Sequence, residues 1–230
     1  MDSSAAQVET EHVHRVYDDI AFHFSHTRYK PWPKIAEFLA ALPSGSFVAD
    51  IGCGNGKYIG CPVRAGVFIH GSDRCRELLE IARSRDHEVL VCDNLLLPYK
   101  DNCFDAVLSI AVIHHFASKQ RRREAIEELA RVLAPKGKMI IYVWAMEQQR
   151  KKFDSQDVFV PWHLQRQFNR KEEEDATKDS KSCFSHTYQR YYHVFKEGEL
   201  RDLIESIPHL QIIQDYYDHE NWCIVAEKIA

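Results

Sequence analysis

Three glycines with alternate spacing, preceded by an acid, are the residues of this sequence best suited to chemistry. Asp50 belongs to the apolar run that begins at Phe47, and Gly52, Gly54 and Gly56 follow it. Such a run predicts a buried strand, and glycine lets the next loop take positive φ angles and approach a ligand closely. A dinucleotide fingerprint needs a glycine three residues after the second one, and none is present. An acid here also suits a cationic or hydroxyl-rich ligand better than a pyrophosphate, although an ordinary strand-to-helix turn remains the alternative.

Two further acids follow the next expected strands. Asp73 comes after the strand 67–71, roughly 20 residues beyond the glycine loop, which is where a βαβ unit holds a ribose diol. Its alternative role is to cap the next helix. Asp93 and Asn94 follow the strand 88–92, where an acid or an amide can meet an adenine amino group. Together these positions predict a nucleoside-binding edge of a sheet.

A pair of histidines ends the fourth expected strand, 104–110. His114 and His115 could ligate a metal, but adjacent side chains diverge and no nearby acid completes a site. We expect one of them to face the pocket and the other to support the fold. Seven cysteines without a Cys-x-x-Cys pair argue against a zinc site and against a disulfide scaffold, and they favour a reducing compartment.

The N-terminal region carries a candidate lid. Tyr17 lies on a predicted amphipathic helix over 8–24, and Arg28 and Trp32 lie in a loop that Pro31 and Pro33 make rigid. These three side chains are placed to close over a site. The alternative is that both aromatic residues pack in the core while the arginine forms a surface ion pair.

Composition and charge limit the class of protein. The chain has 230 residues, of which 45% are hydrophobic and 28% charged, which is typical of one globular domain with an arm. The sequence has neither an apolar run that could span a bilayer nor a secretory signal, so we expect a cytoplasmic location, with the nucleus as a second. The net charge of −4 gives no global attraction to nucleic acid, so binding to RNA would need a local basic patch.

The order of elements predicts an α/β fold. Strands at 47–51, 67–71, 88–92, 104–110 and 138–144 alternate with helices at 33–42, 74–85 and 118–133, which favours a parallel, doubly wound sheet. A short helix over 197–207 and an antiparallel hairpin of 210–217 and 222–229 close it, giving a mixed seven-stranded sheet. We predict one domain over 1–230, with a helical lid at 1–43, a cofactor-binding core at 44–147, a polar mobile insertion at 163–187 and a closing region at 188–230.

The sequence resembles the tRNA wobble-uridine carboxymethyl O-methyltransferases, a family that includes the methyltransferase domain fused to an AlkB-like dioxygenase in animals. The segment ADIGCGNGKYIG is generic to class I methyltransferases that use S-adenosylmethionine, whereas TRYKPWP, VWAMEQ and RYYHVFKEGEL are specific to this family. SIAVIHHF, DVFVPWHL and the terminal NWCIVAEK also match. The resemblance covers both ends and the middle of the chain and leaves out only the polar stretch.

This resemblance implies a methyltransferase with a Rossmann-like fold that uses S-adenosyl-L-methionine to convert 5-carboxymethyluridine at the tRNA wobble position into its methyl ester. It places the cofactor on a set of residues along the first strands. These are Asp50, Gly52, Cys53, Gly54, Asn55, Gly56, Asp73, Arg74, Asp93, Asn94 and Ile110.

The family also implies two partners, the tRNA anticodon loop and a small zinc-binding activator protein that adds a strand to the exposed sheet edge. In this chain we expect that edge at 89–91. An apolar edge strand is an aggregation hazard unless something covers it, which is an independent physical reason for a partner.

The implied reaction makes modest demands on the protein. A carboxylate with a pKa of about 4 is already ionised at neutral pH, so no general base is needed and catalysis is mainly positioning and exclusion of water. An arginine that orients one carboxylate oxygen would suffice. The candidates for direct catalytic contacts are Tyr17, Arg28, His115 and Arg190.

We expect substrate contacts from aromatic walls and from local basic clusters, because single-stranded RNA is held by stacking and by phosphate contacts. Trp32 and Trp144 are the predicted walls, and Lys151 and Lys152 the predicted phosphate contacts. Further basic candidates, for which a solvated helix face is the alternative, are Lys119, Arg121, Arg122, Arg123 and Arg150. Two rival functions stay open: methylation of a small-molecule acid, and an inactive relative that serves as a cofactor-binding scaffold.

Overall fold

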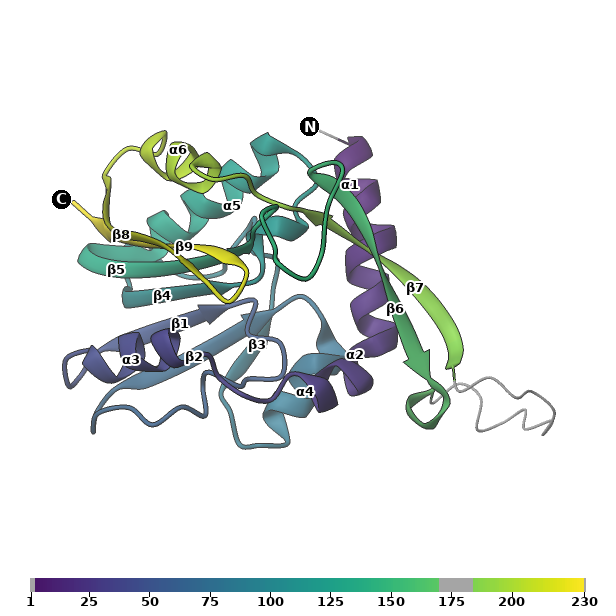
Figure 1. Cartoon of the computed structure of the whole chain (residues 1–230). Coiled ribbons are helices and arrows are strands. Elements are labelled where there is room, and N and C mark those ends of the chain that lie inside the picture. The colour runs from purple at the N-terminus through teal and green to yellow at the C-terminus, as the bar shows by residue number, and fades with distance from the viewer. Residues whose placement is uncertain (1–2, 170–183, 230) are drawn as a thin grey trace.

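The computed structural model describes residues 3–169 and 184–229, which form a seven-stranded sheet with helices on both faces (Figure 1). The spatial order of the strands is β3-β2-β1-β4-β5-β9-β8. The strands are β1 (Phe47–Ile51), β2 (Phe68–Asp73), β3 (Val89–Val91), β4 (Phe104–Ile110), β5 (Leu133–Trp144), β8 (Leu210–Asp218) and β9 (Asn221–Lys228). The first five run parallel, and β9 and β8 are antiparallel additions at one side. The predicted fold class, including the antiparallel closing hairpin, is confirmed.

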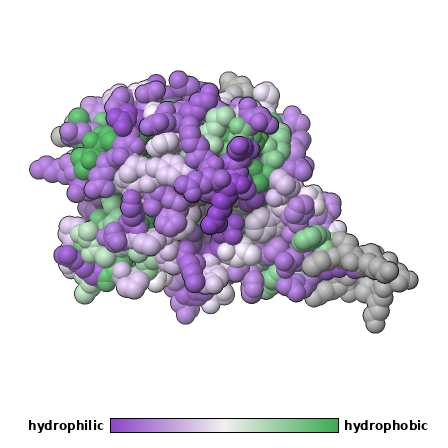
Figure 2. All heavy atoms as spheres, in the orientation of Figure 1, coloured by the Kyte–Doolittle hydropathy of each residue, from purple (hydrophilic) through white to green (hydrophobic). Residues whose placement is uncertain are grey.

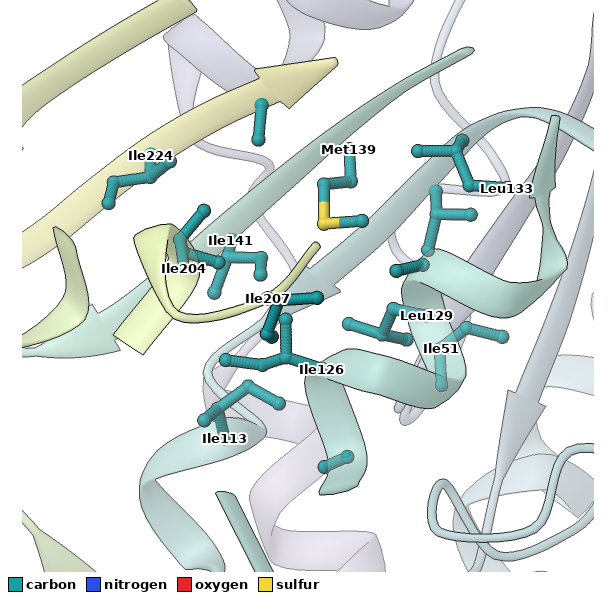
Figure 3. Packing of buried hydrophobic residues seen from close by; sticks show 14 of the residues in the cluster. Ile51, Ile113, Ile126, Leu129, Leu133, Met139, Ile141, Ile204, Ile207 and Ile224 are labelled. Atoms are coloured by element: carbon teal, nitrogen blue, oxygen red, sulfur yellow. The ribbon is translucent and has the colours of Figure 1, made fainter. Parts of the chain in front are cut away.

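Helices cover the two faces of the sheet and bury its apolar strands. On one face, α5 (Lys119–Val132) and α6 (Glu199–Glu205) pack on β4, β5 and β9, and Figure 3 shows Ile126 and Leu129 of α5 meeting Met139 and Ile141 of β5. On the opposite face, α3 (Pro33–Ala41) contributes a separate apolar cluster. The helix α4 (Arg76–Arg83) connects β2 to β3. Burial on both faces explains why the central strands read as continuous apolar runs.

The N-terminal helix is longer than the sequence pattern suggested. It runs through α1 (Ser3–Glu9), a π-helical turn η1 (Thr10–His14) and α2 (Arg15–Thr27), rather than over 8–24. A buried ion pair holds its first part to α5. The Glu9 carboxylate accepts bonds from Arg121 Nη2 at 2.6 Å, from Arg121 Nε at 2.8 Å and from the Ala117 amide at 2.8 Å. The arm is therefore docked to the core by charge as well as by apolar contacts.

A second, two-stranded sheet lies across the carboxyl ends of the main strands, and the sequence did not predict it. The strands β6 (Asp157–Gln165) and β7 (Phe184–His193) pair antiparallel beside α2 (Figure 1). The prediction of a mobile insertion over 163–187 is wrong at both ends, since 163–165 and 184–187 belong to these strands; the part at 170–183 lies outside the described residues. Alternation of buried Val160, Trp162 and Leu164 with exposed neighbours forms the inner face of this hairpin.

The face of the protein seen in Figure 2 is mainly polar, and the cysteines of the described residues are unpaired. Within 3–169 and 184–229, no helix is both long enough and apolar enough to cross a membrane. Figure 2 shows that the visible face is mainly hydrophilic, with separate small hydrophobic patches. Six cysteines of the described part are free thiols.

The buried Glu9–Arg121 pair yields a stability prediction. Replacing Glu9→Gln leaves the guanidinium of Arg121 without its counter-charge, so we expect a loss of about 2 kcal/mol in the free energy of unfolding. Urea denaturation followed by far-UV circular dichroism measures it. Glu127→Gln is the matched control, because Glu127 pairs with Arg123 on the exposed face of the same helix, and it should change stability by less than about 0.5 kcal/mol. Equal losses in the two variants would contradict the docking role.

Candidate functional site

A cavity of about 220 Å³ opens at the carboxyl ends of β1, β2 and β4, between the N-terminal helix and β7. This is the edge at which open α/β sheets bind ligands. Most of the predicted site residues line it. Those brought together are Tyr17, Arg28, Trp32, Gly52, Cys53, Gly54, Asn55, Asp73, Arg74, Asp93, Asn94, Ile110, His115, Trp144 and Arg190.

The glycine loop has the close approach that its spacing predicted. Gly52 has a φ of 80°, and a Cβ there would lie 2.2 Å from Val112 Cγ2, so no other residue fits without movement. Gly54 also has positive φ and lines the cavity, where its amide donates to Asp73 Oδ2 at 2.8 Å. Gly56 does not line the cavity. A Cβ at that position would lie 2.6 Å from His87 Cδ2, so its role is to let the following turn pack.

Asp50 carries a buried carboxylate that no group of the described chain satisfies. Its side chain is 1% exposed, and neither oxygen has a hydrogen-bond partner among the described residues. Burial raises the pKa of Asp50 to about 7, while the nearby charge of Lys57 opposes the shift. Lys57 lines the cavity, and burial lowers its pKa to about 8. Asp50 itself is not among the residues that line the cavity, although its neighbours Ile51 and Gly52 are.

The two acids at the ends of β2 and β3 have partners within the chain. Asp73 accepts from the amides of Gly54 and Cys75, each at 2.8 Å, so it ties the glycine loop to the start of α4. The capping alternative is not met, because the N-cap of α4 is Cys75 and no side chain caps the helix, and the position of Asp73 on the cavity leaves the ribose role open. Asp93 forms an ion pair with Arg74. Asn94 donates to the Ala125 carbonyl at 3.1 Å, and its buried side-chain oxygen has no partner among the described residues.

Both histidines line the cavity, although the sequence predicted that one of them would face it and the other would support the fold. His114 accepts a bond from the Trp144 amide at 3.0 Å and is buried, so it supports the end of β5. His115 bonds the Tyr17 hydroxyl through Nε2 at 3.1 Å and the Tyr191 carbonyl through Nδ1 at 2.9 Å. Burial lowers the pKa of His115 to about 3, so this imidazole is neutral.

The most unusual charge in the site is the buried guanidinium of Arg190, on β7. Arg190 is 4% exposed, and its Nη1 donates to the Tyr192 hydroxyl at 2.8 Å. Its carbon Cζ lies 4.7 Å from the centroid of the Trp162 ring. Among the described residues no carboxylate pairs with it, and its Nε–H has no hydrogen-bond partner. A buried cation in this condition is a ready site for an anion.

Further cations and rings continue from Arg190 toward the mouth of the cavity. Arg28 is exposed, and its Cζ lies 6.0 Å from the centroid of the Trp162 ring. The Trp162 ring therefore contacts two arginines, Arg28 and Arg190. Lys151 Nζ lies 5.0 Å from the centroid of the Trp144 ring, although Lys151 does not line the cavity. Trp32 lines the cavity and lies 5.1 Å from Lys57 Nζ. These cation–π contacts make a positively charged, aromatic mouth.

Several predicted basic contacts are placed elsewhere. Lys152 is exposed and lies outside the cavity. Arg121 is engaged with Glu9, and Arg123 with Glu127 on the surface of α5. Arg122 is buried and donates to the Phe116 carbonyl at 2.9 Å. The prediction that this run of arginines forms an RNA-binding patch is therefore wrong for Arg121 and Arg122, whose guanidinium groups serve internal contacts.

Three residues of the site were missed from the sequence. Lys57 follows Gly56 directly, and its place in the glycine loop was a usable signal. Tyr192 of β7 lines the cavity and Trp162 of β6 packs against Arg190 beside it, and without the hairpin nothing in the sequence placed either of them there. Tyr192 stacks on Trp144, with ring centroids 4.3 Å apart and planes 12° apart.

The buried carboxylate of Asp50 gives a pH-dependent prediction for the ligand-free protein. Because its folded pKa of about 7 lies above the ordinary aspartate value of 3.8, folding favours the protonated form, and this contribution to stability falls as the pH rises from about 4 to about 7. Asp50→Asn removes the cost of the buried charge. We expect the variant to be more stable than the wild type by a few kcal/mol, on the order of 1.4 per pKa unit, above that range, and the gain to vanish toward about pH 4.

Urea denaturation at about pH 5 and about pH 8 measures this gain. The exposed Asp154→Asn serves as the control and should give no gain at either pH. A gain for Asp50→Asn that is the same at both pH values would contradict the assignment of the buried charge.

Comparisons with known proteins agree with this geometry. A family profile described as a methyltransferase domain matches residues 49–141. The solved structure of a methyltransferase in complex with the Trm112 methyltransferase activator of Haloferax volcanii aligns with a TM-score of 0.63 at 16% identity, covering 93% of this chain and 98% of that one. At this identity the likeness concerns the fold, which is that of class I S-adenosylmethionine-dependent methyltransferases.

Curated relatives are much closer in sequence. The tRNA (carboxymethyluridine(34)-5-O)-methyltransferase of Schizosaccharomyces pombe is 47% identical, over 96% of this chain and 98% of the relative. The protein of the same name from Xenopus tropicalis is 42% identical over 98% of this chain, but the chain spans only 42% of that relative's length. Since one relative is matched over nearly its whole length, the chain belongs to the family of tRNA (carboxymethyluridine(34)-5-O)-methyltransferases.

Proposed function

We propose that this chain methylates the carboxylate of 5-carboxymethyluridine at the wobble position of tRNA and so forms the methyl ester. When bound, S-adenosyl-L-methionine supplies a methyl group attached to a positively charged sulfur. A carboxylate oxygen forms the new bond to that methyl carbon as the carbon–sulfur bond breaks, and the two opposite charges cancel. No proton has to move, which agrees with a site whose histidine is neutral and internally bonded.

The residues of the cavity fit this cofactor. The unsatisfied carboxylate of Asp50 and the open backbone at Gly52 and Gly54 suit the amino acid end of the cofactor, where a cationic amine needs an acceptor. Asp73 is placed for the ribose hydroxyls, and the unpartnered oxygen of Asn94 for the adenine amino group. Asp93 also lines this end, but its ion pair with Arg74 makes Asn94 the better adenine contact.

The observation that carries the proposed substrate is the buried Arg190 without an acidic partner. A desolvated guanidinium is costly unless an anion completes it, and a carboxylate matches its paired N–H groups. Tyr192 occupies Nη1, which leaves Nε and Nη2 to orient the substrate carboxylate. Its charge lies in a pocket walled by Trp162 and Tyr192, where water is excluded and electrostatic interactions are strong.

The mouth of the cavity supports an RNA substrate over a small-molecule acid. Arg28 and Lys151 add two cations beyond the one that a single carboxylate needs, and they suit the phosphates that flank a nucleotide in a chain. Trp32 lines the cavity and is placed to stack on a base of a single-stranded loop, whereas Trp144 already stacks on Tyr192 and serves as a wall. The unsatisfied Asp50 and Arg190 likewise argue against a scaffold that has lost its ligands.

We also propose that a small zinc-binding activator of the Trm112 type adds a strand to β3. This strand is one edge of the main sheet, and Leu90 and Val91 are 40% and 52% exposed there. The Cys92 amide bonds inward to the Asp73 carbonyl at 3.0 Å, so by strand alternation the Val91 amide points outward and is open to a new strand. The related fold from Haloferax volcanii was solved in complex with such an activator.

Arg190 gives the test of the reaction. The purified chain, supplied with the activator, labelled S-adenosylmethionine and tRNA that lacks the ester, should yield the labelled methyl ester of 5-carboxymethyluridine after digestion to nucleosides. Arg190→Gln removes the charge that orients the carboxylate, so we expect turnover to fall by about 100-fold while the Kd for the cofactor stays within about twofold.

Arg166→Gln, an exposed arginine beside the end of β6, is the matched control and should retain turnover. The proposed reaction is wrong if the wild-type chain forms no ester with the activator present. The role of Arg190 is wrong if Arg190→Gln loses cofactor binding to the same extent as turnover.

The edge strand gives the test of the partner. Val91→Pro removes the outward amide, and proline is tolerated on an edge strand, so the fold should remain while the activator binds at least about tenfold more weakly. Val91→Ala keeps the amide and should bind within about twofold of the wild type. Titration calorimetry measures both, and unchanged affinity in Val91→Pro would place the activator elsewhere.

A further inference from the structure

A chain of hydrogen bonds leads from Arg190 into the protein and has a single consistent direction. Its links are Arg190 Nη1 to the Tyr192 hydroxyl at 2.8 Å, that hydroxyl to Tyr17 at 3.3 Å, Tyr17 to His115 Nε2 at 3.1 Å, and His115 Nδ1 to the Tyr191 carbonyl at 2.9 Å. Three separate elements, β7, α2 and the turn after β4, supply these groups.

The groups at the two ends of this hydrogen-bond series determine which atom carries each proton within it. A carbonyl only accepts, so His115 Nδ1 must carry a hydrogen, and in the neutral ring Nε2 is then an acceptor. Tyr17 must therefore donate to His115, and Tyr192 must donate to Tyr17. The Tyr192 oxygen is left as an acceptor, which is what the always-charged Arg190 requires. The bonds form one directed series with no conflict.

Packing holds the link that touches the arginine. Tyr192 is 2% exposed and is fixed between Trp144, stacked at 4.3 Å, and Arg190, whose Cζ lies 5.3 Å from its ring centroid. With ring and hydroxyl both held, the bond from Nη1 sets the rotation of the guanidinium plane. The unpartnered Nε–H is then fixed in direction as well.

We propose that Tyr192 is a positioning residue that, through Tyr17 and His115, holds Arg190 so that its free N–H groups select a carboxylate over a carboxamide. This inference rests on the proposed function and extends it to specificity. A carboxylate offers two acceptors to the fixed guanidinium, whereas a carboxamide would turn an N–H₂ group toward one of its N–H donors. A mobile arginine could avoid that clash, and an arginine held by Tyr192 cannot.

The first arm of the test needs neither tRNA nor the cofactor. The Nε–H resonance of Arg190, assigned by its loss in Arg190→Lys, is followed in ¹⁵N-labelled protein during titration with acetate and with acetamide. In the wild type, acetate should shift this resonance and acetamide should not. Tyr192→Phe keeps the stacked ring but removes the hydroxyl, so the affinity for acetate should fall by about tenfold, the loss expected for one hydrogen bond to a charged group.

The second arm measures selectivity on the full substrate. Binding is compared for tRNA that carries either 5-carboxymethyluridine or 5-carbamoylmethyluridine at the wobble position. The wild type should prefer the acid by about tenfold or more, and Tyr192→Phe should reduce this ratio to about one without weakening binding of the amide form. Tyr17→Phe, which breaks the next link, should move the ratio in the same direction by a smaller factor.

The control is Tyr216→Phe. It removes a hydroxyl from another tyrosine pair, Tyr216 with Tyr142 at 3.1 Å, outside the cavity, so it should lower stability comparably and leave the ratio and the acetate response unchanged. The inference is overturned if Tyr192→Phe keeps the wild-type ratio, or if it weakens both tRNAs equally. If the acetate result holds while the wild type forms no ester, the positioning role stands and the proposed reaction fails. If the wild type forms the ester but Tyr192→Phe leaves the acetate affinity unchanged, the proposed reaction stands and the positioning role fails.

Discussion

The site depends on a buried positive charge that the described chain leaves without a counter-ion. The Arg190 guanidinium is removed from water by Trp162 and Tyr192, and its Nη1 donates a hydrogen bond to the neutral Tyr192 hydroxyl. Desolvating a charge in this way is unfavourable by itself. The surrounding fold must therefore be rigid enough to maintain it until an anion arrives, and the three layers of the molecule supply that rigidity.

A complementary arrangement holds at the other end of the cavity. Asp50 is a buried acid without a hydrogen-bond partner, and its pKa of about 7 reflects that burial. Ala111, just after β4, has a φ of 64°, which is unfavourable for a residue with a side chain. Its backbone N–H donates a hydrogen bond to the Tyr142 carbonyl at 2.9 Å, which holds this conformation. The unpaired groups of Asp50 and Arg190 and the strained backbone at Ala111 each reduce stability. Their location at this edge of the sheet indicates that the edge binds ligands.

The element that turns a generic nucleoside-binding sheet into a site for an acid is the β6–β7 hairpin. It brings Trp162, Arg190 and Tyr192 over the carboxyl ends of the main strands, and α2 meets its inner face through Val16 and Ile20. The N-terminal arm is held in turn by the Glu9–Arg121 pair. Substrate selection and attachment of the arm are thus coupled through packing, although their residues lie far apart in the chain.

The amino-acid sequence by itself determined the central sheet, the glycine loop and the positions of Asp73 and His115 near strand ends, because strand periodicity and turn chemistry are local properties. Resemblance added the family, and the chemistry of holding a carboxylate made Arg28 and Arg190 candidates. Only the tertiary structure decided that Arg121 and Arg122 serve internal contacts and that 163–165 and 184–187 are strands. It alone placed Tyr192 between Arg190 and Tyr17. Glu9 and Arg121 are 112 residues apart and Tyr17 and Tyr192 are 175 apart. Pairing over such separations is set by packing, which no local pattern encodes.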